Sequence, residues 1–364
     1  MYFNKFKLFS LAFLLISCSL QAQVYEKSKH FSEHFPVSKN TEINITNKYG
    51  NVHLVSWEKD SVRFEVDLKV SSSKQQKVDK AFNDIDVRFT STPNFVNAST
   101  VFANAGNIWS ELSDMTKTVI NTGNLAEINY TVYLPSDLRV TVDNRFGNVY
   151  TTDHSAATSF TVSNGNLQAN YLAEKSTVVV EFGNANINRV DLGRIELNYA
   201  EIEVKQAGQL TLTGRSSTIH LGSVEALQLD SRRDRIQVDE AISVTGESSF
   251  SRLTFNRLKT SFLLKATYGT LTLGDFSPTF KTLQLNSDYA VNNIYVNSNH
   301  FTAIEVNYRA RTKVNLPVEI KVLEKQEPAP GKDDGFLKAA IGTGLMGSFR
   351  FNTSGGEVNI FYKP

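Results

Sequence analysis

The chain has 364 residues, with 38 Lys and Arg against 37 Asp and Glu, which gives a net charge of +1 at pH 7. This balance provides no electrostatic field that would gather nucleic acid or an anionic membrane surface, so we expect no nucleic-acid partner. Thr, Val, Ile, Asn and Tyr are plentiful and helix-favouring runs are scarce, which predicts strands joined by turns.

Residues 1–22 have the layout of a secretory signal peptide. Lys5 and Lys7 precede an apolar run at residues 8–16, and a polar stretch ends at Ala22. The apolar run is far shorter than the ~20 residues that a spanning helix needs, and no later stretch approaches that length. We therefore expect an exported protein without a transmembrane helix, located in the periplasm, the outer membrane or at the cell surface.

Cys18 is the single cysteine, and it allows two interpretations. Residues 15–18 resemble a bacterial lipobox, which would place a lipid on Cys18, whereas residues 20–22 resemble an ordinary cleavage site after Ala22. Under either interpretation the folded part has no disulfide, so its stability must come from an extensive core.

Residues 23–40 show no clear period and are interpreted as a lead-in. Residues 41–135 are expected to hold the N-terminal strands, a capping helix and an insertion. Strict alternation at residues 62–70 predicts a half-buried strand. Val78, Phe82 and Ile85 share one face of a helix predicted over residues 73–85, with Ser73 as its N-cap. Residues 93–125 form the insertion, whose role the sequence leaves open.

Residues 136–364 contain an internal repeat. A small or turn-forming residue, here called the pivot, is followed by apolar residues two and four positions later, and successive pivots are 17 or 18 residues apart. The clearest pivots are Gly147, Gly165, Gly183, Ala200, Ser217, Asp234, Ser251 and Gly269. Gly50 and Gly356 repeat the pattern outside this run, and looser pivots lie near Ala290 and Ala310.

The two apolar columns are those that a stack of parallel strands buries. At plus two stand Val149, Leu167, Ala185, Ile202, Ile219, Ile236, Leu253 and Leu271, and at plus four Thr151, Ala169, Ile187, Val204, Leu221, Val238, Phe255 and Leu273. A second strand precedes each pivot, marked by pairs such as Val178 and Val180, Leu227 and Leu229, and Ile242 and Val244. The predicted fold is an all-β, single-stranded parallel β-helix, right-handed by general crossover chirality, with coils of about 17–21 residues.

Short motifs carry a family resemblance. They are Asn-Lys-Tyr-Gly-Asn-Val at residues 47–52, Phe-Gly-Asn at 182–184, Tyr-Gly-Thr at 268–270 and Ser-Gly-Gly-Glu-Val at 354–358. Together they resemble the bacterial putative-adhesin family, a domain of unknown function common on exported proteins. Over roughly residues 40–364 the resemblance implies a β-solenoid with a surface or periplasmic role. The resemblance implies no catalytic residue.

Two groups of residues are candidates for ligand contact. Arg232, Arg233 and Arg235 form a dense basic patch that can hold an anionic sugar, although a solvated turn has the same composition. An aromatic column precedes the pivots, and it is either a sugar-stacking stripe or a stack at a corner or inside the fold. Its members are Phe146, Phe182, Tyr199, Phe250, Tyr268, Tyr289 and Tyr308.

Other motifs favour structural interpretations. Residues 342–347 match the dinucleotide fingerprint G-x-G-x-x-G, but no alternating strands and helices surround them, so we expect a turn and no cofactor. His30 and His34 lack a third ligand, so no metal is expected. The sequence favours a non-enzymatic, adhesin-like or scaffold protein that presents a β-helix face to a glycan or protein partner. The alternative is a polysaccharide-active β-helix enzyme whose site is built from coil insertions.

Overall fold

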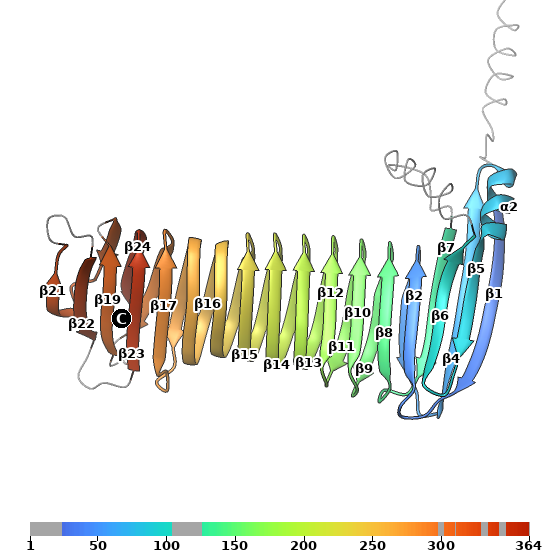
Figure 1. Ribbon diagram of the computed structural model, residues 1–364, viewed down its shortest axis with the longest axis horizontal. Coiled ribbons are helices and arrows are strands. Elements are labelled where there is room, and N and C mark those ends of the chain that lie inside the picture. The colour runs from blue at the N-terminus through green and yellow to red at the C-terminus, as the bar shows by residue number, and fades with distance from the viewer. Residues whose placement is uncertain are drawn as a thin grey trace, which may run out of the picture.

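The computed structural model describes residues 24–103, 126–297, 302–309, 311–328, 334–341 and 347–363. Within these residues the chain is all-β with one helix, as the sequence predicted, and its strands form one 24-stranded mixed sheet. Figure 1 shows the strands stacked along one long axis. The predicted signal peptide, Cys18 and residues 104–125 of the predicted insertion lie outside the described residues.

The central array runs from β8 to β16, and its strands pair in parallel with an offset of one repeat. Phe160 is in register with Val142 and Val178, and Leu167 with Val149 and Ala185. The strands are β8 (Arg139–Arg145), β9 (Val149–His154), β10 (Thr158–Ser163), β11 (Asn166–Leu172), β12 (Ser176–Glu181), β13 (Asn184–Asn198), β14 (Glu201–Arg215), β15 (Thr218–Arg232) and β16 (Arg235–Phe276). The spacing of the sequence repeat therefore equals the offset between residues that are in register on neighbouring strands.

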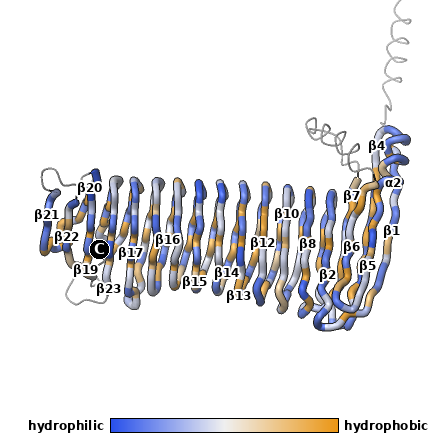
Figure 2. The backbone as a smooth tube through the Cα atoms, viewed as in Figure 1, coloured by the Kyte–Doolittle hydropathy of each residue, from blue (hydrophilic) through white to orange (hydrophobic). Residues whose placement is uncertain are grey.

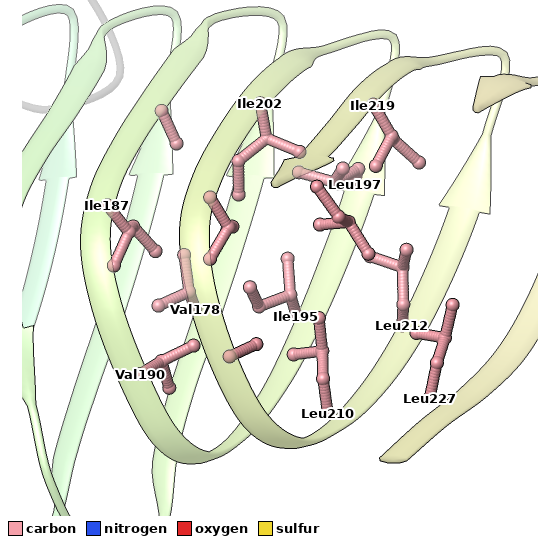
Figure 3. Packing of buried hydrophobic residues seen from close by; sticks show 14 of the residues in the cluster. Val178, Ile187, Val190, Ile195, Leu197, Ile202, Leu210, Leu212, Ile219 and Leu227 are labelled. Carbon is pink, nitrogen blue, oxygen red and sulfur yellow. The ribbon is translucent and has the colours of Figure 1, made fainter. Parts of the chain in front are cut away.

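The core is built from columns of apolar side chains that stack from one coil to the next (Figure 3). Every plus-two and plus-four residue predicted to be inward is buried. Hydropathy alternates along the chain in the same way (Figure 2), as expected where one face of each strand is buried. A third inward column, at plus seven, was not predicted: His154, Leu172, Val190, Ala207, Val224, Ala241, Leu258 and Phe276. These residues all stand seven positions after a pivot, so the sequence repeat held the information needed to predict this column.

One inward assignment was wrong. Ile242 was predicted to point inward with Val244, but Ile242 is exposed. Leu227 and Leu229 are in register with Val244 and Gly246, so the inward pair lies two residues later than predicted. A Cβ on Gly246 would overlap the carbonyl oxygen of Leu229, and its φ is +137°, so this position takes glycine and the apolar alternation is lost.

At the N-terminal end the order in the stack differs from the order in the chain. β2 (Glu42–Lys48) and β3 (Val52–Ser56) form a coil that pairs in parallel with β8 and β9. Its other edge pairs with β6 (Phe95–Phe102) and β7 (Ala126–Leu134). The outer layer adds β1 (Tyr25–Pro36), β4 (Ser61–Ser72) and β5 (Ile85–Ser91), which pair antiparallel. β1 occupies part of the predicted lead-in, where the sequence showed no period.

Helix α2 (Gln75–Asp84) confirms the one predicted helix. Val78 and Ala81 are buried, and α2 packs against β1, β4 and β5. The predicted cap was wrong, because Lys74 occupies the N-cap position and makes no side-chain capping bond. Ile85, expected on the helix, is the first residue of β5. α2 stands at the N-terminal end of the stack, beside the antiparallel strands β1, β4 and β5 (Figure 1).

At the other end a later segment is inserted between earlier ones. β17 (Thr282–Asp288) and β18 (Val291–Asn297) pair with β16 on one side and with β23 (Gly347–Ser354) and β24 (Gly356–Lys363) on the other. β23 and β24 in turn pair with β19 (Thr302–Arg309) and β20 (Thr312–Asn315). β22 (Asp334–Ile341) and β21 (Lys321–Gln326) then close this end with antiparallel pairs.

Candidate ligand-binding face

The residue before each pivot has an unusual backbone conformation. Ten non-glycine residues in this column have φ between 51° and 66°, in the left-handed region that such residues seldom adopt. They are Tyr49, Phe146, Asn164, Phe182, Tyr199, Ser216, Arg233, Phe250, Tyr268 and Tyr289. Their backbone N–H groups stay hydrogen-bonded across coils, as when Asn164 donates to the carbonyl of Glu181 (2.8 Å). The same corner therefore recurs in each coil.

Glycine at the next position follows from the tight stacking of these corners. A Cβ on Gly165 would overlap the carbonyl oxygen of Gly147, and a Cβ on Gly183 that of Gly165. In later coils the pivots include Ala, Ser and Asp, and the Ser and Asp side chains accept hydrogen bonds from the backbone. The Oγ of Ser217 accepts the N–H of Ala200 (3.2 Å), and Oδ1 of Asp234 accepts the N–H of Ser217 (2.8 Å).

Seven aromatic residues of this corner column form what we call the aromatic ladder: Tyr49, Phe146, Phe182, Tyr199, Phe250, Tyr268 and Tyr289. All but Tyr49 have between 42% and 62% of their surface exposed. The sequence left open whether this column was exposed, and the structure places it on an outer corner. Tyr308, predicted as a member, is buried, because it is in register with Thr353 on the inward side of β23.

The rings of the aromatic ladder stack face to face where neighbouring coils both carry one. Phe182 and Tyr199 lie 5.3 Å apart between centroids at an interplanar angle of 1°, and Phe250 and Tyr268 lie 4.9 Å apart at 15°. Tyr49 stacks on Phe146 at 5.3 Å. Asn164 interrupts the ladder once, and Ser216 with Arg233 interrupts it a second time. The ladder is therefore three short stacks separated by two gaps.

The predicted basic patch lies at the second gap. Arg232, Arg233 and Arg235 are exposed, and none forms an ion pair with a carboxylate of the described residues. Arg232 is in register with Arg215, whose guanidinium is held by Asp230 at 2.8 Å. Unneutralised guanidinium groups between aromatic stacks can bind a carboxylate or sulfate bidentately.

A ladder of asparagines follows the pivot on the neighbouring face. In four of its five members the side-chain oxygen accepts the backbone N–H of the Asn in the next coil, at 2.9 to 3.2 Å. Its members are Asn129, Asn51, Asn148, Asn166 and Asn184. This ladder accounts for the Asn of the Phe-Gly-Asn motif, since it satisfies backbone donors where the pivot is glycine.

An open groove of about 670 Å³ lies farther along the same face. His53 and Tyr150 stack at its end at 4.6 Å, and exposed polar side chains such as Gln168 and Asn186 line it. Glu203 is the single carboxylate among the described residues that line it. Hydrolysis of a glycosidic bond uses two carboxyl groups, so this groove is suited to binding. Gln168, Asn186 and Glu203 stand between the plus-two and plus-four residues, so alternation places them outward but gives no sign of a groove.

A second hollow, of about 340 Å³, gathers carboxylates that the sequence analysis missed. Asp191, Glu225 and Glu240 line it, from positions plus eight and plus six of different coils. The hydroxyl of Tyr171 donates to Asp191 at 2.5 Å and lowers the pKa of that carboxyl, and Arg189 pairs with it at 2.7 Å. Asp191 is thus held ionised and cannot serve as a general acid.

The sequence predicted structural roles for two further motifs. In the G-x-G-x-x-G motif residues 342–346 lie outside the described residues, and Gly347 begins β23. His30 is held by Asp67 at 2.8 Å and Glu65 at 3.0 Å, and the bond to Asp67 raises the pKa of its imidazole. No helix among the described residues is long and apolar enough to cross a membrane.

The fold defines an all-β protein with one mixed sheet and an outward aromatic corner. No protein-family model matches the chain, and no curated protein matches it. Several solved structures align with it, including the following three. One is described as a putative cell adhesion protein from Clostridium sporogenes, at 10% identity over 92% of this chain and 100% of that one, with a TM-score of 0.19.

The other two are described as putative adhesins. That from Parabacteroides merdae is 10% identical over 74% of this chain and 89% of its own, with a TM-score of 0.20. That from Bacteroides fragilis is 9% identical over 92% and 97%, with a TM-score of 0.17. The three descriptions agree with the family resemblance of the sequence motifs. TM-scores this low do not indicate a function, which must be inferred from the residues of this chain.

Proposed function

We propose that this chain is an exported, non-enzymatic, adhesin-like protein that binds a surface glycan on the face formed by the aromatic ladder and the groove. The observation that carries the proposal is the exposure of the ladder rings Phe146, Phe182 and Tyr199 on coils that also line a groove with amide side chains. Sugars are bound by aromatic rings that stack on their C–H faces and by amides that match their hydroxyls. Arg232, Arg233 and Arg235 would contact acidic groups of the same glycan.

Supporting proposals concern the fold and the export route. We infer that the stack winds as a right-handed, single-stranded parallel β-helix, because parallel partners in β8 to β16 are one repeat apart and crossovers are right-handed as a rule. A crystal structure would reveal a left-handed coil if this were wrong. Export rests on residues 1–22, and mass spectrometry of the mature N-terminus distinguishes a lipidated Cys18 from cleavage after Ala22.

The test of glycan binding uses purified protein on a glycan array, followed by calorimetry with the best oligosaccharide. The double variant Phe182→Ala/Tyr199→Ala should weaken binding by about tenfold or more, since each lost aromatic contact is worth on the order of 1 kcal/mol. A matched control, Thr211→Ala/Thr213→Ala on the strand before the pivot, should bind as the wild type does. A wild-type protein that binds no glycan on the array would refute the proposal.

The second candidate function is enzymatic cleavage of a polysaccharide at the hollow that contains Asp191, Glu225 and Glu240. The gathering of three carboxylates favours it, whereas the ionised state of Asp191 weighs against it. Incubation with a polysaccharide panel and measurement of reducing ends distinguishes the two functions. Release of reducing ends by the wild type, abolished in Glu225→Gln or Glu240→Gln, would establish an enzyme.

A further inference from the structure

The first gap in the aromatic ladder is bounded by two rings. Phe146 and Phe182 flank the Asn164 coil, and each has one face covered by an outer neighbour, Tyr49 and Tyr199 respectively. In each pair the two rings are stacked and within 14° of parallel. Because the paired rings come from neighbouring coils, their planes lie roughly perpendicular to the long axis of the stack. Their uncovered faces are therefore turned toward each other across Asn164. We call this space the slot.

The width of the slot follows from the spacing of the coils. Neighbouring strands are ~4.8 Å apart, so rings two coils apart are separated by roughly 10 Å. Rings in contact lie ~4.5–7 Å apart, which means that Phe146 and Phe182 do not touch and that one inserted ring would stack on both at about 5 Å. Asn164 does not fill this space as an aromatic residue would. Its side chain is exposed and makes no hydrogen bond with a described residue.

Polar groups border the slot on both sides. After the pivot, Asn148 and Asn166 carry the asparagine ladder past it, and both belong to coils that form its walls and floor. Before the pivot, the Oγ of Ser163 donates to Glu181 at 3.3 Å. A ligand in the slot therefore meets apolar faces above and below and hydrogen-bonding groups at its edges.

We propose that the slot binds one pyranose ring whose substituents are all equatorial, within the glycan of the proposed function on which this inference rests. A ring of gluco configuration presents C–H groups on both faces and hydroxyls around its edge, which matches two flanking rings and two polar borders. An axial hydroxyl, as in manno or galacto sugars, would place an oxygen against one phenyl face and leave it without a partner.

The same geometry sets the path of the glycan chain. Equatorial linkages at opposite edges of the pyranose lead out of the slot toward either polar border. On the side after the pivot, the outward side chains of Asn166, Gln168 and Asn170 follow in line on β11 and reach the groove. The glycan then crosses the stack along the strand direction rather than running along its length.

The experiment fills the slot with a residue that the corner already accepts. Asn164→Phe places a phenyl ring in a column where Phe146 and Phe182 have the same backbone conformation, with φ of 57° and 52°. We expect affinity for cellohexaose, measured by calorimetry, to fall at least tenfold. The matched control Ser216→Phe adds the same ring at the other gap and should bind cellohexaose as the wild type does. The wild type should bind cellohexaose at least tenfold more tightly than mannohexaose.

The outcomes separate this inference from the proposed function. Equal cellohexaose binding by the wild type and by folded Asn164→Phe overturns the slot and leaves glycan binding intact. Absence of any glycan binding by the wild type refutes the proposed function itself. If Asn164→Phe fails to fold, Phe146→Ala, which removes one wall, replaces it and must show the same loss. Loss of a dimer in sedimentation with unchanged sugar affinity would mean that a second copy fills the slot, which also overturns the inference.

Discussion

The Phe-Gly-Asn triplet combines three separate physical requirements in adjacent residues. In Phe182-Gly183-Asn184 the Phe adopts the left-handed corner and projects outward, the Gly avoids a carbonyl oxygen of the neighbouring coil, and the Asn donates its backbone N–H to the side-chain oxygen of Asn166. Where the pivot is Ser217 or Asp234, its side chain accepts the backbone N–H of the pivot residue in the preceding coil. The motif thus specifies architecture, while its Phe also supplies the exposed ring.

Replacement of a glycine pivot tests the close approach. Gly165→Ala should lower the free energy of unfolding by about 2–3 kcal/mol, because the new Cβ meets the carbonyl oxygen of Gly147 and the backbone must move. Urea unfolding followed by circular dichroism measures the change. Ala200→Gly at the equivalent corner serves as control and should cost about 1 kcal/mol or less. A loss for Gly165→Ala no larger than that of the control would contradict the steric account.

His154 makes stability depend on pH. It is fully buried in the plus-seven column, bonds Thr151 Oγ1 at 2.6 Å, and burial lowers its pKa to about 4. Because the folded pKa lies below the unfolded value of 6.5, the unfolded chain binds the proton more readily. The contribution of His154 to the free energy of unfolding is therefore fully present above pH 6.5, and it falls by about 3 kcal/mol as the pH drops to 4.

The double variant Thr151→Ala/His154→Leu reproduces Ala169 and Leu172, the residues in register in the next coil. We expect it to fold and to lose this contribution to the pH dependence. Urea titrations at pH 7.5, 6, 5 and 4.5 compare the two proteins. Parallel pH profiles for wild type and variant would show that His154 is not the group responsible.

Individual elements were predictable where their signal was local. The columns at plus two and plus four follow from alternation within each strand, and the helix from Val78 and Phe82 one turn apart. The exposure of Phe182 and its neighbours was not predictable, because an aromatic residue at a corner has the same local pattern whether it points inward or outward. Tyr308 shows the limit, since its place depends on a partner strand more than forty residues later.

Pairing between distant segments stabilises the far end of the stack. Val291 is in register with Glu357, a separation of 66 residues, against the 17 or 18 of the central array. Deletion of residues 347–363 should unfold β19 to β22, which lose their parallel partners, and leave β8 to β16 protected, since each coil depends on its immediate neighbours. Hydrogen exchange by mass spectrometry measures this. Deletion of Lys321–Gln326 removes only the outermost strand, so it should leave β17 to β20 protected.

The whole molecule is a stack whose two ends differ from its middle. Antiparallel layers close both ends, and no described strand pairs with the outer edge of β21. That edge strand is exposed along its length and carries Lys321, Glu324 and Lys325. Charged residues on an edge strand discourage pairing with another chain. The ends thus favour separate stacks over filaments formed end to end.

Removal of these charges tests that role. Lys321→Thr/Glu324→Thr/Lys325→Thr should associate with rising concentration, because β21 then offers an uncharged edge. Analytical ultracentrifugation detects the larger species. The control Arg194→Thr/Glu196→Thr changes charges on β13, which is paired on both edges, and should sediment as the wild type does. Identical sedimentation of all three proteins would show that the edge charges have no such effect.

The insertion of β23 and β24 between earlier strands also constrains the timing of folding. A ribosome releases β19 and β20 before the strands that separate them from β17 and β18, so this end cannot assemble in the order of synthesis. The central array can form coil by coil as it emerges, because each coil needs only the previous one. Chain growth and fold completion are therefore uncoupled at one end, where the nascent protein must leave one edge of β17 and β18 unpaired until β23 and β24 arrive.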